Sequence, residues 1–239
     1  MSVTSSSLLS NPPRILAIIL VVLISNNAWS SQPWKEKKYQ DWDEKDVQKI
    51  LTDSPWAKLV TRTGLEAPEG PSEDASGVDL LGTHSKEAQS GDTQQTRFIV
   101  RWVSSRTVRE ASARALVLQK RISAEAINEH LQPAGDDFVL AIVGPDMGRF
   151  QHVVPSVLQS KSYLAAESNK KISPTSVNIM SLKDGTIGAL LFHFPRTTST
   201  GPLLSGREKS VRFSERGGDV SMDVIFEPRK MTDQSGVDF

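Results

Sequence analysis

The residues best suited to bind a ligand are aromatic side chains that cluster near the beginning of the chain. Within 23 residues the sequence places Trp34, Tyr39, Trp42 and Trp56. Exposed aromatic rings in such a cluster are what a sugar-binding or peptide-binding site would use. A segment this short has no core of its own, so we favour the alternative in which these rings anchor it onto the rest of the protein.

A second candidate binding surface is a basic stretch between positions 97 and 121, in which Glu110 is the only acid. At 100° per residue, Arg106, Arg109 and Arg114 lie opposite the apolar stripe of a predicted helix, on its outward face. A solvated helix face is the ordinary explanation of such a pattern. The functional alternative is docking to an anionic component of the cell envelope or to an acidic protein partner.

Patterns for catalysis and metal binding are weak. The hydrolase motif G-x-S-x-G is absent, and the four histidines are too widely scattered to suggest a zinc site. We therefore predict no catalytic residue, no metal and no cofactor. The competing interpretation is a secreted hydrolase of unfamiliar type, in which the turn from Gly144 to Gly148 and His152 share one pocket.

The first 30 residues have the pattern of a secretory signal. Arg14 precedes the apolar run from Ile15 to Ile24, and small residues follow up to Ser30, after which we predict cleavage. Ten apolar residues rise only about 15 Å as a helix, against ~30 Å for a hydrocarbon core, so no transmembrane span is predicted in the mature chain. The chain has no Cys, which excludes disulfides and an acylated-Cys anchor.

Net charge gives no global attraction to nucleic acid or to a membrane. The chain has 28 basic and 28 acidic residues, and only Arg14 lies in the leader, so the mature chain carries 27 against 28, a net charge of −1. Together with the export signal, this disfavours nucleic acid as a partner. We predict a periplasmic or secreted protein.

The aromatic stretch also carries a resemblance. The pattern W-x-x-x-D-V-x-K-I-L-x-D-S-P-W from Trp42 to Trp56, R-W-x-S-S-x-x-V-R-E-A from Arg101 to Ala111, and a final F-E-P-R-K-M resemble a group of uncharacterised secreted bacterial proteins. That resemblance implies export and no particular activity. Around Trp42 the sequence is also faintly similar to GWxTD-type domains, with Asp41 in place of the glycine and Glu44 in place of the threonine.

Composition divides the chain into five parts. Residues 61–95 are rich in Gly, Pro, Ser, Thr and acids, which predicts a flexible linker or a long loop. It separates an aromatic helical segment at 31–60 from a main domain at 96–231. The signal peptide at 1–30 and a frayed tail at 232–239 complete the division.

Helix-start patterns dominate the 31–60 segment. Asp43 can cap a helix whose first turn holds further carboxylates, where they favour the positive end of the helix dipole. Val47 and Ile50 begin an apolar stripe along that helix. Ser54 followed by Pro55 predicts the start of a second helix.

Strands and helices alternate in the main domain. The sequence predicts strands at 97–103, 138–143, 177–182, 186–194, 210–214 and 219–226, and helices after Ser105 or Thr107, from Ser123 to Leu131, and at 153–166. Hairpin turns join the last two pairs of strands. We predict an α+β fold on a largely antiparallel sheet with two or three packed helices, preceded by the short helical segment and the flexible linker.

Taken together, these patterns favour an exported, non-enzymatic interaction or structural module of the cell envelope or the secreted proteins. The alternatives are the secreted hydrolase and a carbohydrate-binding module that uses the clustered tryptophans.

Overall fold

The computed structural model describes residues 31–63, 95–132, 135–166, 171–199, 201–218 and 220–239. The predicted signal peptide and nearly all of the predicted linker lie outside these residues. Residues 32–239 form one compact unit. The aromatic segment and the main domain are therefore parts of a single folded body, and the segment docks on its own chain.

The largest sheet has five antiparallel strands in the order β1-β2-β3-β7-β6. Its strands are β1 (Ala57–Thr63), β2 (Gln95–Trp102), β3 (Asp137–Val143), β7 (Ile187–Pro195) and β6 (Ser176–Ser181). Three of these strands are rich in β-branched and aromatic residues, which fit a pleated and largely buried surface. The prediction of a largely antiparallel α+β fold is confirmed.

A second antiparallel sheet has the order β11-β10-β4-β5. It consists of β11 (Met222–Phe226), β10 (Val211–Glu215), β4 (Tyr163–Ala166) and β5 (Lys171–Ile172). Two short ladders add β8 (Thr197–Thr198) with β9 (Gly201–Pro202), and β12 (Thr232–Asp233) with β13 (Gly236–Val237).

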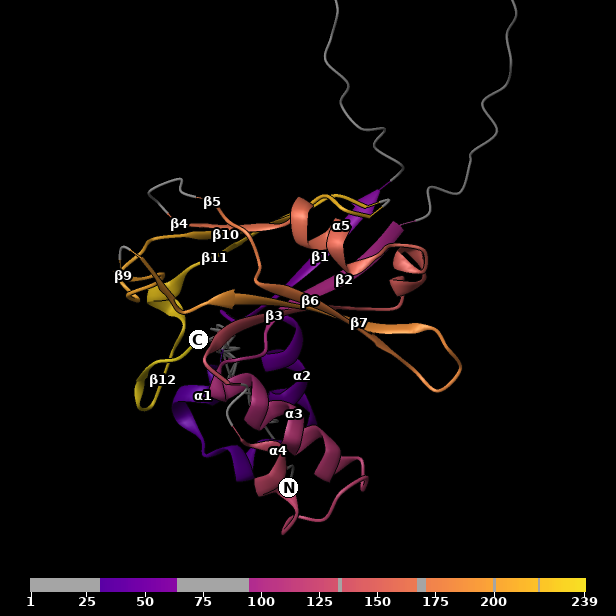
Figure 1. Cartoon of the computed structure of the whole chain (residues 1–239). Helices are drawn as coiled ribbons and strands as arrows, with labels where there is room; N and C mark the ends of the chain where they lie inside the picture. Colours follow the sequence, from indigo (N-terminus) through magenta and orange to yellow (C-terminus); the bar gives the residue numbers. More distant parts are fainter. Residues whose placement is uncertain (1–30, 64–94, 133–134, 167–170, 200, 219) are drawn as a thin grey trace, which may run out of the picture. The chain divides into compact units, whose positions relative to one another are not determined.

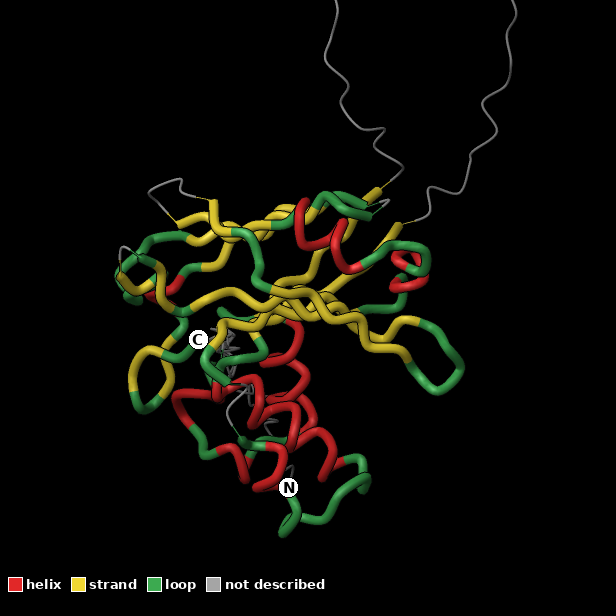
Figure 2. Tube along the Cα trace, in the orientation of Figure 1, coloured by secondary structure: helices red, strands yellow, loops and turns green. Residues whose placement is uncertain are grey.

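The helices are short apart from one. They are α1 (Pro33–Glu36), α2 (Glu44–Thr52), α3 (Arg106–Leu118), α4 (Ile127–His130) and α5 (Pro155–Lys161), with 3₁₀ turns η1 (Tyr39–Asp41), η2 (Met147–Phe150) and η3 (Pro228–Lys230). Figures 1 and 2 show that α1 to α4 gather on one side of the five-stranded sheet, whereas the four-stranded sheet covers the other side.

Aromatic side chains fill the layer between the two sheets. The rings of Phe192 on β7 and Phe213 on β10 lie 5.2 Å apart, and those of Trp102 on β2 and Phe226 on β11 lie 5.4 Å apart. Both are edge-to-face contacts, the geometry that aromatic quadrupoles favour. In each strand, every second side chain points to this layer. The hydrophobic residues that recur at every second position of the sequence therefore fill it.

Caps fix where the two main helices begin. The side chain of Asp43 accepts from the amide of Asp46 at 2.9 Å, and the Asp46 carboxylate accepts from the amide of Asp43 at 3.2 Å. This reciprocal capping box confirms the predicted helix start. For α3, Ser105 rather than Thr107 is the cap, because its hydroxyl accepts from the amide of Val108.

Two predictions of local structure were wrong in part. Ser54 and Pro55 do not start a helix, since Ser54 pairs with Ala57 in a tight turn and the chain continues as β1. Burial against the rest of the protein overrides the local helix-start pattern, because the residues that follow Pro55 form β1, the edge strand of the five-stranded sheet. The helix predicted at 153–166 ends at Lys161, and β4 begins at Tyr163 to join the second sheet.

The end of the chain is folded, which corrects the prediction of a frayed tail. Phe239 packs against Trp102 and Phe138, at ring distances of 6.2 and 5.5 Å. The Asp238 carboxylate accepts from the amides of Arg106 and Thr107 at the beginning of α3. These contacts link residues more than 100 positions apart, so local sequence patterns do not reveal them.

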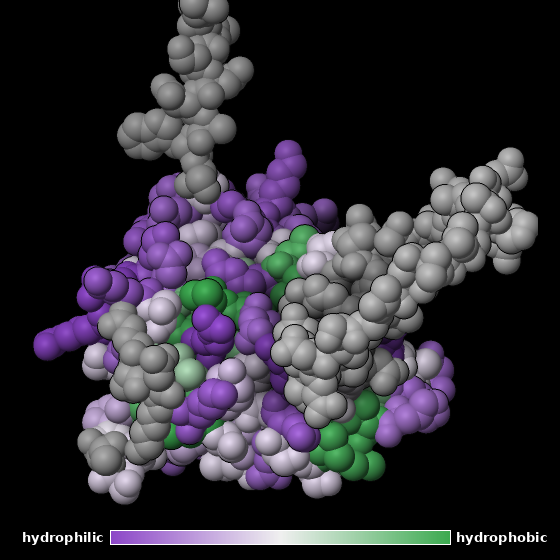
Figure 3. All heavy atoms as spheres, turned by 90° about the horizontal axis from the view of Figure 1, so that it is seen from above, coloured by the Kyte–Doolittle hydropathy of each residue, from purple (hydrophilic) through white to green (hydrophobic). Residues whose placement is uncertain are grey.

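The surface above the four-stranded sheet is mainly hydrophilic. In Figure 3, which views the molecule from that side, hydrophobic groups are small and separated by polar side chains where the described residues are visible. Within the described part of the chain, no helix has both the length and the apolar character needed to cross a membrane.

Candidate functional site

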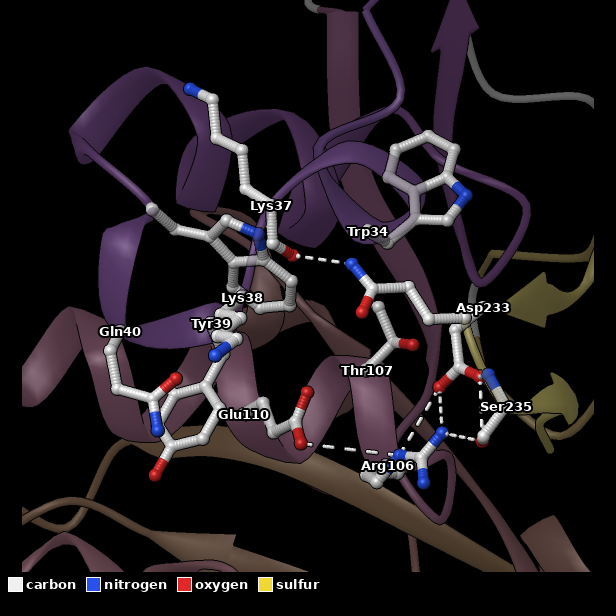
Figure 4. A pocket seen from close by; sticks show the side chains of 12 residues that line it. Trp34, Lys37, Lys38, Tyr39, Gln40, Arg106, Thr107, Glu110, Asp233 and Ser235 are labelled. Atoms are coloured by element: carbon white, nitrogen blue, oxygen red, sulfur yellow. Dashed lines mark hydrogen bonds and ion pairs between the residues drawn. The ribbon is translucent and has the colours of Figure 1, made fainter.

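A pocket of about 220 Å³ opens where three distant segments meet. The loop from α1 to α2, the first turns of α3 and the β12–β13 turn form its walls (Figure 4). Its lining residues are Trp34, Lys37, Lys38, Tyr39, Gln40, Trp42, Arg106, Thr107, Glu110, Asp233, Gln234 and Ser235.

Hydrogen bonds hold the first wall in place. The indole nitrogen of Trp42 donates to the carbonyl of Pro33 at 3.1 Å, which closes the loop around the ring. Lys37 pairs with Asp46 at 2.6 Å, and its backbone carbonyl accepts from the Gln234 side chain at 3.1 Å. The loop is therefore tied both to α2 and to the β12–β13 turn.

An arginine joins the second wall to the third. The guanidinium of Arg106 donates to Asp233, with one contact at 3.1 Å, and also to the hydroxyl of Ser235. The Ser235 hydroxyl in turn donates to Asp233 at 2.9 Å. Burial opposes the ionisation of Asp233, but the hydrogen bonds from Arg106 and Ser235 outweigh it, so the pKa of this carboxyl is lowered.

Glu110 is the unusual group in the pocket. Its side chain is only 20% exposed, and its nearest cation, the Arg106 guanidinium, lies 3.9 Å away, beyond hydrogen-bonding distance. Burial raises the pKa of Glu110 to about 7; the charges of Asp233 and Asp238 add to the rise, and those of Arg106 and Arg109 oppose it. A carboxylate with this pKa changes its charge near neutral pH.

The structure brings four of the seven predicted binding residues to this one pocket: Trp34, Tyr39, Trp42 and Arg106. The sequence assigned them to two separate surfaces, an aromatic segment and a basic helix face. They meet because α2 packs along α3, which places the loop before α2 beside the beginning of α3.

The tryptophans are anchors and not an exposed platform. Trp34, Trp42 and Trp56 are 5%, 2% and 0% exposed, so their rings cannot stack on a sugar as the carbohydrate interpretation requires. Trp34 and Trp56 pack edge to face at 5.5 Å, and Trp56 donates to the carbonyl of Asp238 at 2.5 Å. Their large apolar area is better buried in the common core than left in water.

Two of the predicted basic residues are committed to the fold. Arg109 and Arg114 are half-buried, and they donate to the carbonyls of Leu131 and Trp42 at 2.5 and 2.9 Å. The helix face that carries them is covered by the chain around α4 and by the N-terminal segment. It is therefore not a solvated cationic stripe, and the predicted anion-docking surface loses these two residues.

The turn proposed for a hydrolase shows no catalytic arrangement of the predicted kind. Asp146 accepts from the amide of Arg97 at 2.7 Å, and His152 is exposed. Gly144 has a φ of +151°, and a Cβ there would lie 2.6 Å from the Arg97 carbonyl oxygen, so close packing accounts for this glycine. Within the described residues, no group of three His, Cys, Asp or Glu side chains is arranged to hold a metal ion.

A separate feature is an apolar row on the helix-bearing face of the five-stranded sheet. Strand registers place Leu59, Ile99, Val143, Ala189 and Met180 side by side, one from each strand. The inner three are half-buried, whereas Leu59 and Met180 at the ends are 60% and 54% exposed. The helices leave the ends of this row uncovered.

Sequence reasoning missed two important residues of the pocket, Glu110 and Asp233. Glu110 was visible as the only acid in a basic stretch, but its place one helical turn from Arg106 predicts an ordinary ion pair on a helix surface. Asp233 gave no such signal, because its partner Arg106 is 127 positions away.

Compared with protein-family models, curated proteins and solved structures, the chain matches none of them.

Proposed function

We propose that the protein is an exported, non-catalytic binding module and that the pocket at the beginning of α3 is its ligand site. The observation that supports this is the convergence of Trp34, Tyr39 and Trp42 with the half-buried Glu110 around one open cavity. Small-ligand sites typically combine aromatic walls with a few polar groups in this way. The export signal and the resemblance to secreted proteins support the location.

The polar groups of the pocket favour binding over catalysis. Ser235, which carries one of the hydroxyls of the pocket beside Thr107 and Tyr39, donates to Asp233, whose pKa is lowered by Arg106 and Ser235 itself. A carboxylate that is held ionised by an arginine is a poor base for a serine. Glu110, the group with a suitable pKa, shares no hydrogen bond with that hydroxyl in the described residues.

The test is a screen of small compounds against the full chain by two-dimensional NMR. Cationic, anionic, zwitterionic and neutral compounds are each represented. We expect at least one class to shift the amide signal of Thr107 and the indole signal of Trp34, and we expect Ser235→Phe, which fills the mouth of the pocket, to abolish the shift.

Ser181→Phe is the matched control, because Ser181 is an exposed serine that does not line the pocket. This variant should leave binding unchanged. A complete screen in which no class shifts the pocket signals would contradict the proposal.

The apolar row supports a second candidate function, the docking of another protein on the five-stranded sheet. Its exposed ends, Leu59 and Met180, are joined by three further apolar residues in adjacent strands. Only these two ends are exposed, and the three residues between them are half-buried, but apolar residues that adjoin one another mark interaction sites more often than isolated ones do.

A photo-crosslinking amino acid placed at position 59 or 180 tests this second function in the cells that produce the protein. Both positions should form adducts with the same partner. Position 225 is the control, because Ile225 is also 53% exposed but lies on the outer face of the other sheet. Equal adducts from position 225 would show that the row has no special role.

A further inference from the structure

Among the described residues, one carboxylate of the pocket, that of Glu110, has no hydrogen-bonded partner and only a long ion pair with Arg106, at 3.9 Å. Lys37 is paired with Asp46 at 2.6 Å, and Arg106 is paired with Asp233. Glu110 accepts no hydrogen bond from any described residue, although four-fifths of its side chain is buried. A buried carboxylate in this condition lacks donors that water or a ligand would otherwise supply.

We propose that the pocket binds a small primary ammonium ion, with Glu110 as the acceptor of its N–H groups. This inference rests on the proposed function and adds the chemical class of the ligand. An ammonium ion supplies a closer positive charge than Arg106 at 3.9 Å and the hydrogen-bond donors that Glu110 lacks, and hydrogen bonds between charged groups are stronger than neutral ones.

The walls favour the same class of ligand. Trp34, Tyr39 and Trp42 line the cavity and limit the access of water, and the half-buried Tyr39 is the ring that a cation can approach. An anion in the pocket would be repelled by the carboxylates of Glu110 and Asp233. The nearest guanidinium, that of Arg106, already donates its hydrogen bonds to Asp233 and Ser235. The exposed Lys38 is the remaining cation on the rim, so anionic binding is an outcome that the experiment must include.

The volume of the pocket limits the size of the ligand. About 220 Å³ corresponds to roughly seven water molecules at about 30 Å³ each. Pockets for drug-sized ligands are larger, at about 300–1,000 Å³. The ligand is therefore a small alkylamine or the amino end of a longer molecule.

Binding of an ammonium ion should be coupled to ionisation of Glu110. Only the ionised carboxylate forms the ion pair, so affinity should rise with pH through the pKa of about 7. The charged and titratable groups that face Glu110 are Arg106 and Arg109 on α3, Asp233 and Asp238 on the C-terminal segment, and Lys37, Lys38 and Tyr39 on the N-terminal segment.

The experiment titrates the ¹⁵N-labelled full chain with propylammonium chloride, 1-propanol and sodium propionate, which differ in charge at nearly constant size. We expect only propylammonium to shift the signals of Thr107 and the Trp34 indole in a saturable manner at pH 8. Glu110→Gln, which keeps the shape of the side chain and removes its charge, should weaken binding at least about tenfold.

Glu129→Gln is the matched control, because Glu129 is an exposed glutamate of α4 that does not line the pocket. It should leave the affinity unchanged. For the unmodified chain, affinity should be about thirtyfold lower at pH 5.5 than at pH 8, since a pKa of about 7 leaves roughly 3% of Glu110 ionised at pH 5.5. This pH series needs no variant and so does not depend on the folding of one.

Retained affinity in Glu110→Gln, or equal affinity at the two pH values, would overturn the assignment of Glu110. Saturable pocket shifts with propionate or 1-propanol in place of propylammonium would exclude the ammonium class but leave the proposed binding function standing. No pocket shift with any of the three probes would also exclude the ammonium class, and the wider screen would then decide the binding function separately.

Discussion

Two carboxylates of this protein, Glu110 and Glu215, lie where water solvates them poorly. Glu215 is 0% exposed at the end of β10, and one of its oxygens accepts from the amides of Gly217 and Gly218. Burial raises its pKa to about 7, and these two amides oppose the rise. Its second oxygen is buried without a hydrogen-bond partner among the described residues, so the protonated form is favoured there.

The raised pKa of Glu215 makes stability depend on pH. The folded state binds the proton more tightly than an unfolded chain with a pKa of about 4.5, so stability is greatest below that value and is lost as pH rises to about 7. We expect Glu215→Gln, which keeps the acceptor oxygen, to increase the free energy of unfolding by on the order of 1–3 kcal/mol at pH 8. At pH 4.5, where the folded state gains about 3 kcal/mol by binding this proton, the stabilisation by the substitution should disappear.

Urea denaturation followed by circular dichroism at both pH values measures these differences, with Glu129→Gln as a control that should show neither. Equal stabilisation by Glu215→Gln at pH 4.5 and pH 8 would mean that its carboxylate is not the source of the pH dependence.

At the scale of elements, α3 organises the site. Ser105 and Asp238 together satisfy three of the amides at its beginning, those of Arg106, Thr107 and Val108. Amides at a helix N-terminus have no partner within the helix, and negative charge there is favoured by the helix dipole. The C-terminal segment therefore acts as part of the cap, and it delivers Asp233 and Ser235 to the pocket.

Removal of the Asp238 carboxylate should destabilise the fold. Asp238→Ala leaves the amides of Arg106 and Thr107 without acceptors, and we expect a loss of about 2 kcal/mol in the free energy of unfolding. Asp136→Ala, at an exposed aspartate, should change it by less than about 0.5 kcal/mol. Chemical denaturation of both variants checks this, and similar losses for the two would remove the special role of Asp238.

At the scale of the whole molecule, the described fold is one unit whose core draws on both the first and the last of the described residues. Trp34, Trp56 and Phe226 belong to the same buried cluster, and Phe239 packs against it. The compact unit begins at Gln32, two residues after the predicted cleavage point at Ser30. Cleavage after Ser30, as the sequence predicts, would therefore remove no residue of this unit.

Processing of the leader is a direct prediction at this scale. When the full chain is expressed in bacteria, the protein recovered outside the cytoplasm should begin at Ser31, because small residues precede the cleavage point after the apolar run. Mass spectrometry of the intact protein measures this. Arg14→Glu, which reverses the charge before the apolar run, should reduce the exported fraction. Exported protein that retains residues 1–30 would contradict the prediction.

Local patterns in the sequence were sufficient for much of the fold. The cap at Asp43, the buried strand around Phe138 and the two hairpins were predicted because each depends on neighbouring residues and on the periods of helix and strand. The sequence also placed the functional interest in the aromatic segment and in the first turns of α3. It did not reveal that the two surfaces form one pocket.

Only the tertiary structure decided what those residues do. Ser54 and Pro55 lead into a strand because an edge of the sheet was available, and Trp34 and Trp42 are buried because α2 packs on α3. The pairing of Arg106 with Asp233, which leaves Glu110 only a long ion pair with Arg106, depends on a contact across more than 100 residues. Composition and periodicity carry no information about such distant pairs, whereas burial and charge in the folded chain determine them.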